Sequence, residues 1–144
     1  DIHLRKIWMM RKVAIVLIED EFGRVVLQLR DDKPGLIHAN LYSFFGGAVE
    51  PGETPSVAAL RELCEELSIP ARADKLAFLW RMTTHQPQGV FDLHVFHYRM
   101  GDEIRDVVVT EGQGMGLFRR EDITSWERFS DVAQECLTRF WQMR

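Results

Sequence analysis

The stretch Gly46–Ile69, GGAVEPGETPSVAALRELCEELSI, limits what this chain can fold into more than any other part of its sequence. It opens with a turn signal, Gly46-Gly47, and continues into a segment with helical periodicity. Thr54 is a favoured N-cap, and Pro55 at the first helical position needs no backbone donor. We therefore expect a helix that begins near Thr54 and ends at about Leu67.

The predicted helix has an acidic side and an apolar side. Because successive residues are rotated by about 100°, Glu62, Glu65 and Glu66 fall within roughly a third of the circumference. The helix should pack against the domain with its other side, where we expect Val57, Leu60, Leu63, Cys64 and Leu67.

Three carboxylates at this spacing repel one another unless something compensates their charge. Arg61 is the only basic residue inside the helix, and Glu50 and Glu53 add two more acids in the preceding loop. A hard divalent cation is a natural compensator, and Mg²⁺ in particular binds a few carboxylates together with waters and substrate phosphates. The alternative is a solvated acidic helix face, which is what most charge runs form.

The spacing of these residues resembles the Nudix box, G-x5-E-x7-R-E-U-x-E-E-x-G-U, in which U is a bulky aliphatic residue. Gly47, Glu53 and the run Arg61–Ile69 match every fixed position except one, where Ser68 stands for the glycine. The resemblance implies an α/β fold, the Nudix-type α/β/α sandwich with a mixed, partly antiparallel sheet. It also implies a single Nudix hydrolase domain over residues 1–144.

Ser68 changes the end of the helix and none of its carboxylates. A glycine just past a helix end usually adopts the left-handed conformation, in which a serine costs about 1 kcal/mol. The alternative is a different turn, helped by Pro70, because proline cannot continue the helix.

Length, charge and cysteine usage limit the class of protein. The chain has 144 residues, the size of one domain. Its net charge of −4 argues against a protein that coats nucleic acid, and no apolar run is long enough to cross a membrane. Cys64 and Cys136 are isolated thiols, which we expect to be small core residues in a reducing, cytoplasmic setting.

Alternating and apolar runs predict strands on both sides of the box helix, the first two as a hairpin. The expected strands are Lys12–Glu19, Val25–Arg30, Leu41–Phe45, Asp74–Thr84, Val90–Met100 and Val107–Thr110. Ser130 should cap a last helix that ends at about Gln142 and buries an apolar stripe.

The resemblance also implies roles for residues of the box. Glu65 and Glu66 are metal ligands, and Glu62 is either a third ligand or the base that orients the attacking water. Arg61 holds the carboxylates in place. The implied cofactor is Mg²⁺, with Mn²⁺ as the alternative.

Outside the helix, the resemblance implies that the Gly46 carbonyl is a metal ligand, which is compatible with a plain tight turn. Glu53 assists substrate binding from the loop. Arg30 is either a phosphate contact or an exposed strand charge. Glu111, beside a glycine-rich loop, is either a further metal ligand and candidate base or a plain loop residue.

The implied reaction is hydrolysis of a phosphoanhydride bond in a nucleoside diphosphate linked to another group. The small size favours a nucleoside triphosphate pyrophosphohydrolase of the MutT type. A nucleotide-sugar or ADP-ribose pyrophosphatase is the alternative, and a non-catalytic nucleotide-sensing domain is an alternative of another class. The sequence leaves open which nucleobase the substrate carries. It also leaves open the oligomeric state, for which a homodimer is one alternative. Four aromatic residues are candidates for stacking on a base, with a core position as the alternative: Trp80, Phe91, Phe118 and Trp126.

Overall fold

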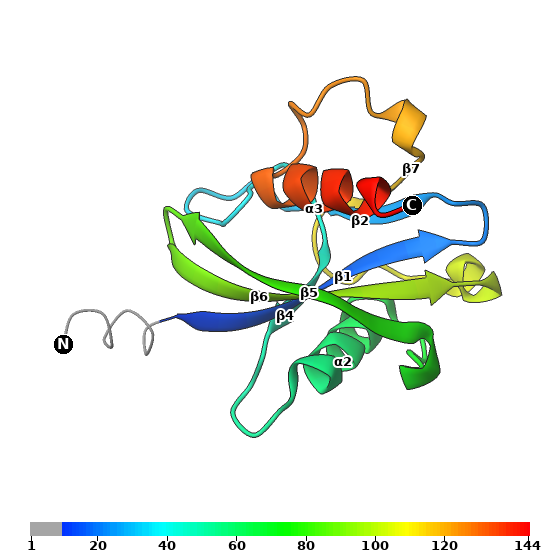
Figure 1. Ribbon diagram of the computed structural model, residues 1–144, viewed down its shortest axis with the longest axis horizontal. Helices are drawn as coiled ribbons and strands as arrows, with labels where there is room; N and C mark the ends of the chain where they lie inside the picture. Colours follow the sequence, from blue (N-terminus) through cyan, green and yellow to red (C-terminus); the bar gives the residue numbers. More distant parts are fainter. Residues whose placement is uncertain (1–9) are drawn as a thin grey trace.

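The computed structural model describes residues 10–144, so the domain predicted for residues 1–144 is described from Met10 onward. A mixed β-sheet lies between two helices (Figure 1). Helix α2 (Pro55–Leu67) covers one face of the sheet and helix α3 (Asp131–Gln142) covers the other. The expected α/β/α sandwich is therefore confirmed.

The seven strands follow the order β3-β2-β1-β6-β5, with β4 paired to β1 and β7 paired to β2. Strands β1 and β6 run parallel, and the remaining pairs are antiparallel, including the predicted β1–β2 hairpin. The strand bounds are β1 Arg11–Asp20, β2 Val25–Leu29, β3 Tyr42–Ser43, β4 Phe45–Ala48, β5 Leu76–Gln86, β6 Gly89–Met100 and β7 Gly114–Phe118. Short 3₁₀ helices span Ala73–Lys75, Asp102–Asp106 and Arg120–Asp122.

Strand β1 has two partners along the edge opposite β6. Its second half pairs with β2, as Ile18 does with Val26, and its first half pairs with β4, as Ile15 does with Gly46. The sheet therefore splits along β1, because β2 and β4 pair with different halves of this strand. The loop that joins β2 to β3, residues 30–41, lines a pocket together with residues of β4.

The core consists of one apolar cluster on each face of the sheet. Strand β6 shows the predicted alternation, because Phe96 packs on the α2 side and Val95 on the α3 side. The predicted N-caps are confirmed. The hydroxyl of Thr54 accepts from the backbone N–H of Val57, and that of Ser130 accepts from the N–H of Ala133. The α3 stripe is buried as expected at Val132, Ala133, Cys136, Leu137 and Phe140.

Helix α2 buries only part of the side that its periodicity predicts, because Leu63 and Leu67 are buried and Leu60 packs against the core as expected, but two other predicted residues are not buried. Its buried residues are Ala58, Ala59, Leu63, Glu66 and Leu67, whereas Val57 and Cys64 are exposed. The physical reason is the size of the contact residues. Two alanines allow the helix to approach the sheet closely, and this approach turns the flanking side chains outward and Glu66 inward. The expectation that Cys64 is a core residue was wrong.

The prediction of a strand at Val107–Thr110 was also wrong, because backbone N–H groups of this segment donate hydrogen bonds to carbonyls at the end of α2. The N–H of Val108 bonds the carbonyl of Leu67 at 3.0 Å, and the N–H of Thr110 bonds the carbonyl of Glu66 at 3.0 Å. The hydroxyl of Thr110 also donates to the carbonyl of Glu65 at 2.7 Å. This extended segment satisfies carbonyls that a helix end leaves without partners. Half of the glycine-rich loop that follows forms strand β7.

Helix α2 ends at Ser68, which adopts the left-handed conformation with φ of 55° and ψ of 37°. The first of the two alternatives for this position is therefore the one that the structure adopts. In the part of the chain that the structure describes, no helix combines the length and the hydrophobicity that a membrane span requires.

Candidate active site

Two glycines of β4 let the acids of α2 reach the sheet. A Cβ atom at Gly47 would lie 2.4 Å from Oε1 of Glu62, so no side chain fits at this position without moving that carboxylate. Gly46 has a φ of 145°, and a Cβ there would lie 2.1 Å from the carbonyl oxygen of Ala14. The N–H of Gly46 donates to Oε1 of Glu66 at 3.2 Å. Strand β4 and helix α2 therefore meet through backbone and carboxylate atoms.

Glu66 is the most unusual acid in this cluster, because only 2% of it is exposed. Burial, followed by the hydrogen bond and the charge of Glu62, raises the pKa of Glu66 from 4.5 to about 9. The N–H of Gly46 acts in the opposite direction, and Glu111 raises the pKa further. In the absence of a cation, this carboxyl therefore keeps its proton at neutral pH.

Arg61 ties together the other acids of the motif. Its guanidinium donates to both carboxylate oxygens of Glu53, at 2.7 and 2.9 Å, and to Glu62 at 2.9 Å. The same guanidinium also donates to Glu65 at 3.3 Å and to the carbonyl of Ala48 at 3.0 Å. The hydrogen bond from Arg61 is the main cause that lowers the pKa of Glu53 to about 2, and the pKa of Arg61 rises in turn.

Glu111 is held beside the helix by contacts of its backbone. The side chain of Gln28 donates to the carbonyl of Glu111 at 3.1 Å, and the N–H of Gln113 bonds the carbonyl of Leu29 at 2.8 Å. The carboxylate itself is exposed and close enough to Glu66 to affect its pKa. Glu66 is thus hydrogen-bonded to Glu62 and lies within reach of the charge of Glu111.

Arg30 is half-buried and not an exposed strand charge. It follows β2 directly, and its Nε donates to the carbonyl of Ile37 at 3.0 Å across the 30–41 loop. Its role as a phosphate contact stays a prediction.

The donor atoms at this site suit a hard cation. Glu62, Glu65, Glu66 and Glu111 carry carboxylate oxygens, and the Gly46 carbonyl lies on the adjoining strand, which is the kind of set that Mg²⁺ or Mn²⁺ prefers. Within residues 10–144, however, no three acid, histidine or cysteine side chains are already grouped closely enough to hold a metal ion. Glu62 and Glu65 are instead bonded to Arg61. The predicted ligand set stays a prediction, and side chains must turn to complete it.

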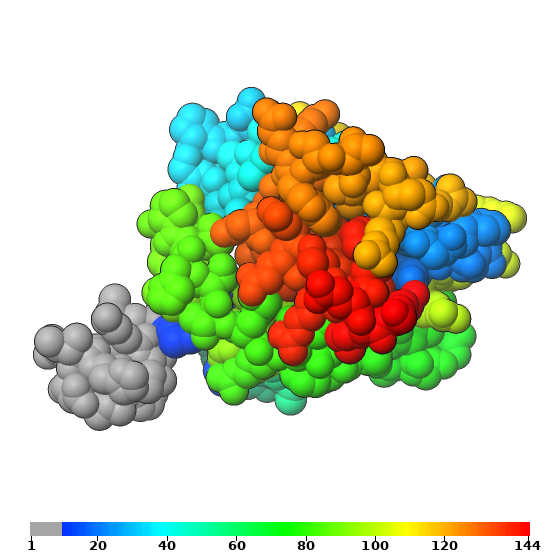
Figure 2. All heavy atoms as spheres, turned by 45° about the horizontal axis from the view of Figure 1, so that its top comes forward, coloured from blue at the N-terminus to red at the C-terminus, as the bar shows by residue number. Residues whose placement is uncertain are grey.

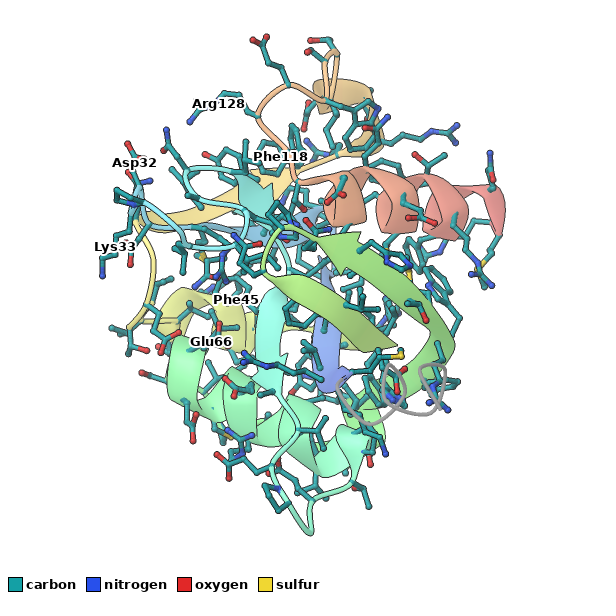
Figure 3. The ribbon with its side chains drawn as sticks, turned by 90° about the vertical axis from the view of Figure 1, so that its left-hand side faces the viewer. Asp32, Lys33, Phe45, Glu66, Phe118 and Arg128 are labelled. Carbon is teal, nitrogen blue, oxygen red and sulfur yellow. The ribbon has the colours of Figure 1, made fainter. Side chains whose placement is uncertain are left out.

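Two hollows adjoin the acids and share Arg30. The outer hollow, of about 410 Å³, is open and polar, and Gln28, Arg30, Asp31, Lys33, Thr110 and Glu111 are among its lining residues. The inner pocket, of about 210 Å³, lies on the α3 side of the sheet and is mainly apolar, with Ile15, His38, Ser43, Gly47, Thr84 and Phe91 among its lining residues. Figure 3 shows Asp32 and Lys33 on the 30–41 loop, on the same side of the molecule as Glu66.

The aromatic candidates divide between the pocket and the core. Phe91 lines the inner pocket, whereas Trp80 is buried against α3 and stacks under the guanidinium of Arg139. Phe118 and Trp126 both pack around Phe129, away from the acids.

Sequence reasoning missed the polar residues of the inner pocket, among them His38, Ser43 and Thr84. These residues come from segments far apart in the chain, and no local pattern marks them. Lys33 in the outer hollow was missed as well, although a basic residue three positions after Arg30 was a usable signal.

The sequence model described as the NUDIX domain matches residues 9–137 of this chain. The chain belongs to the Nudix family. This Nudix hydrolase is 34% identical to the 8-oxo-dGTP diphosphatase of Haemophilus influenzae over 102 residues, which cover 71% of each chain. It is a pyrophosphohydrolase by membership in this family and by that relationship.

Solved structures show the same fold at lower identity. A MutT protein from Methanosarcina mazei superposes with a TM-score of 0.79 at 20% identity and covers 93% of this chain and 94% of its own. A bifunctional NMN adenylyltransferase/ADP ribose pyrophosphatase from Francisella tularensis, complexed with AMP and a Mn ion, gives a TM-score of 0.70 at 17% identity. That match covers 99% of this chain and 46% of the larger protein.

Proposed function

We propose that this Nudix hydrolase cleaves a phosphoanhydride bond of a nucleoside triphosphate in the presence of Mg²⁺ and releases pyrophosphate. The observation that carries the proposal is the position of the buried Glu66. It bonds the N–H of Gly46, which lines the inner pocket, and it lies within reach of the charge of Glu111, which lines the outer hollow. A substrate that occupies both hollows therefore contacts residues that adjoin the acids.

The inner pocket suits a nucleobase. Its volume of about 210 Å³ is smaller than the roughly 300–1,000 Å³ of sites that take a whole ligand, so it holds one part of the substrate. Apolar walls such as Ile15 and Phe91 favour a flat, weakly polar group. Gly46 and Gly47 also line it, and this contact leaves the phosphate end of the substrate beside the acids.

The outer hollow suits the polyphosphate chain. Arg30 and Lys33 supply positive charge to it, and Arg guanidinium groups bind phosphate oxygens in paired hydrogen bonds. Because Arg30 lines both hollows, it can contact the phosphate nearest to the nucleoside. Asp31 and Glu111 make the same hollow unfavourable for a polyanion that carries no cation.

In the reaction, the oxygen of a water molecule forms a bond to phosphorus, and the bridging oxygen leaves with pyrophosphate. Glu66, with Glu62, Glu65 and Glu111, would hold Mg²⁺, which when bound would neutralise phosphate charge and polarise the phosphorus and the water. Glu62 or Glu111 accepts the proton of the attacking water at a carboxylate oxygen. Arg61 orients Glu62 and Glu65 through the bonds described above. Glu53 supports the site by anchoring Arg61 from the loop.

Two findings favour a triphosphate over a nucleotide sugar or ADP-ribose. The relative with 34% identity is an 8-oxo-dGTP diphosphatase. The inner pocket has room for one base, while the outer hollow is open and basic residues reach into it, an arrangement that suits phosphates better than a second sugar.

The proposal is tested with a substrate panel of nucleoside triphosphates, 8-oxo-dGTP and ADP-ribose, with Mg²⁺, Mn²⁺ or a chelator. Phosphorus NMR in ¹⁸O-labelled water reports both the bond broken and the phosphorus attacked. We expect pyrophosphate from triphosphates and no turnover with chelator. A higher kcat/KM for ADP-ribose, with release of AMP, would instead establish the alternative substrate class.

Variants test the proposed ligands. Glu66→Gln and Glu65→Gln should each lower kcat by roughly 100-fold or more, because a ligand to the cation is lost where charge develops. Glu135→Gln, at an exposed position of α3, is the matched control and should keep the wild-type rate. Wild-type rates in both ligand variants would refute the assignment.

A further inference from the structure

Glu111 lies on a segment that is hydrogen-bonded on both of its sides. We call this segment, residues 108–113, the strap. Its first half is bonded to α2, because the N–H and the hydroxyl of Thr110 both donate to carbonyls in the last turn of that helix. Its second half is bonded to strand β2, where the side chain of Gln28 donates to the carbonyl of Glu111 at 3.1 Å. The strap therefore fixes Glu111 relative to both the helix and the sheet.

Gln113 joins the strap to the 30–41 loop. Its backbone N–H donates to the carbonyl of Leu29 at 2.8 Å, at the end of β2. Its side-chain nitrogen donates to the carbonyl of Arg30 at 2.8 Å and to Oδ1 of Asn40 at 2.9 Å, which lie near the two ends of the loop. Both protons of this amide are thereby used. One side chain on the strap thus holds the loop at its base.

The backbone on both sides of this contact is shaped to permit it. A Cβ atom at Gly112 would lie 2.7 Å from the carbonyl oxygen of Leu29, so the strap passes β2 more closely than a side chain allows. Asn40 has a φ of 59°, in the left-handed region that asparagine enters more readily than most residues. Its N–H bonds the carbonyl of Asp31 at 3.0 Å, while its side chain accepts from Gln113. The loop is therefore closed on itself, and Gln113 attaches the closed loop to the strap.

The loop and the strap form two walls of the outer hollow. Arg30 and Lys33 line it from the loop, and Thr110 and Glu111 line it from the strap. Because Gln113 bonds the loop from the strap, it sets how far the basic residues of one wall stand from the carboxylate of the other.

We propose that Gln113 is a positioning residue for the part of the substrate that leaves as pyrophosphate. It holds Arg30 and Lys33 in register with Glu111, so that the phosphates meet the basic residues and the acids at the same time. This inference rests on the proposed function, because it requires the polyphosphate chain to lie in the outer hollow. A loop that is released from the strap must be ordered by the substrate itself, and this loss of conformational entropy weakens phosphate binding.

The test uses Gln113→Met, which keeps the length of the side chain and removes both donors. The substrate is the triphosphate that the wild-type protein hydrolyses best, with Mg²⁺. We expect KM to rise by about tenfold, because two bonds to the loop are lost. The value of kcat should stay within about twofold, because Glu111 keeps its bond from Gln28 and Thr110 still ties the strap to α2.

Inhibition by the two products locates the change. The Ki of pyrophosphate should rise by about the same factor as KM, since pyrophosphate binds in the outer hollow. The Ki of the nucleoside monophosphate should stay within about twofold, since its base lies in the inner pocket. A general loss of structure would affect both inhibitors and kcat as well, so the difference between them distinguishes positioning from stability.

Asn40→Gly tests the same bond from the side of the loop. Glycine accepts the left-handed backbone and removes the acceptor, so KM should rise by a smaller factor than in Gln113→Met. In the double variant, KM should be no higher than in Gln113→Met alone, because both changes remove one interaction. Asn40 and Gln113 are both exposed, so these substitutions leave the core intact.

Gln88→Met is the matched control. Gln88 also donates to the 30–41 loop, at the carbonyl of Gly35 at 3.3 Å, but it does so from the turn between β5 and β6. Figure 2 shows this turn (green) beside the loop (cyan) at the surface of the molecule. Because Gln88 does not connect the loop to the strap, its replacement should leave KM, kcat and both inhibition constants unchanged.

Amide hydrogen exchange provides a measurement that needs neither metal nor catalysis. In Gln113→Met, the N–H of Asn40 should exchange about tenfold faster than in wild type, because the loop is no longer held at its base. The amides of α2 should keep their wild-type rates.

The outcomes separate the two levels of the argument. An unchanged KM and pyrophosphate Ki in both Gln113→Met and Asn40→Gly would overturn the positioning proposal while the proposed function stands. Equal increases in Gln88→Met, or a loss confined to kcat, would overturn it as well. Failure of the wild-type protein to hydrolyse any triphosphate would overturn the proposed function itself, and the positioning proposal with it.

Discussion

Replacing Glu66 with glutamine should stabilise the metal-free protein and at the same time remove its response to Mg²⁺. The reason is the buried carboxyl, whose pKa is raised from 4.5 to about 9 by burial and by Glu62. Between these pH values the folded protein keeps a proton that the unfolded chain has released, so stability falls as pH rises. The contribution is complete below pH 4.5 and is lost progressively toward pH 9. At pH 7, with about 1.36 kcal/mol for each pKa unit, the loss relative to acid conditions is about 3 kcal/mol.

Glutamine removes this pH dependence and keeps the local bonds. Its carbonyl can accept from the N–H of Gly46, and its amide can donate to Glu62, as the protonated carboxyl does. We therefore expect the metal-free Glu66→Gln protein to be more stable than wild type by up to about 3 kcal/mol at pH 7, with a smaller difference at about pH 5. Saturating Mg²⁺ at 100 times its Kd should add about 2.7 kcal/mol to wild type and nothing to the variant.

Urea denaturation in the presence of a chelator, at about pH 5, 7 and 8.5, measures these differences. Glu65→Gln is the control, because the Glu65 side chain is 59% exposed and its replacement removes a carboxylate of the same motif without changing a buried carboxyl. A Glu66→Gln protein that is less stable than wild type at every pH would refute the reasoning. So would a wild-type stability that does not change over this range.

Three further outcomes follow from the geometry. Ser68→Gly should raise the free energy of unfolding by about 1 kcal/mol in denaturation experiments, because it relieves a left-handed serine, while Ser68→Ala should give no gain. Gly47→Ala should lower kcat by about tenfold or more with little change in Tm, since its Cβ would push away the carboxylate end of Glu62, and equal kcat values would contradict this. Burial acts to raise the pKa of Asp92, but the bonds and charge of Arg81 together with the neighbouring His94 outweigh it and lower this pKa, so Asp92 stabilises the fold above its unfolded pKa and loses this effect in acid. Arg81→Met should therefore move the acid-unfolding midpoint to higher pH, as followed by circular dichroism, and an unchanged midpoint would contradict the reasoning.

The sequence predicts the helix of the motif well because its signals are local. Thr54, Pro55 and the left-handed Ser68 define both ends of α2, and each acts through its own backbone conformation or hydrogen bond. Rotation of the helix about its axis depends on what it packs against. Ala58 and Ala59 permit a close approach to the sheet, a property that periodicity of larger apolar residues does not reveal.

The remaining differences have non-local causes. The composition of the Val107–Thr110 segment predicts a strand, but its backbone N–H groups donate to carbonyls at the end of α2 instead of to a neighbouring strand. The hydrogen bond between His38 and Asp131 joins residues that are 93 positions apart in the chain. Neither residue belongs to a motif, so only the fold shows that they meet.

Arg61 stabilises the acidic motif of α2 when no cation is bound, through ion pairs that a cation can replace. Its single charge faces Glu53, Glu62 and Glu65, and it lowers the repulsion that the spacing of these acids would otherwise cause. Glu66 avoids the same repulsion by holding a proton. A cation that binds both Glu62 and Glu66 must therefore displace the proton that Glu66 holds, and it competes with Arg61 for Glu62. Because protons leave on binding, the apparent affinity for Mg²⁺ should increase with pH across the neutral range.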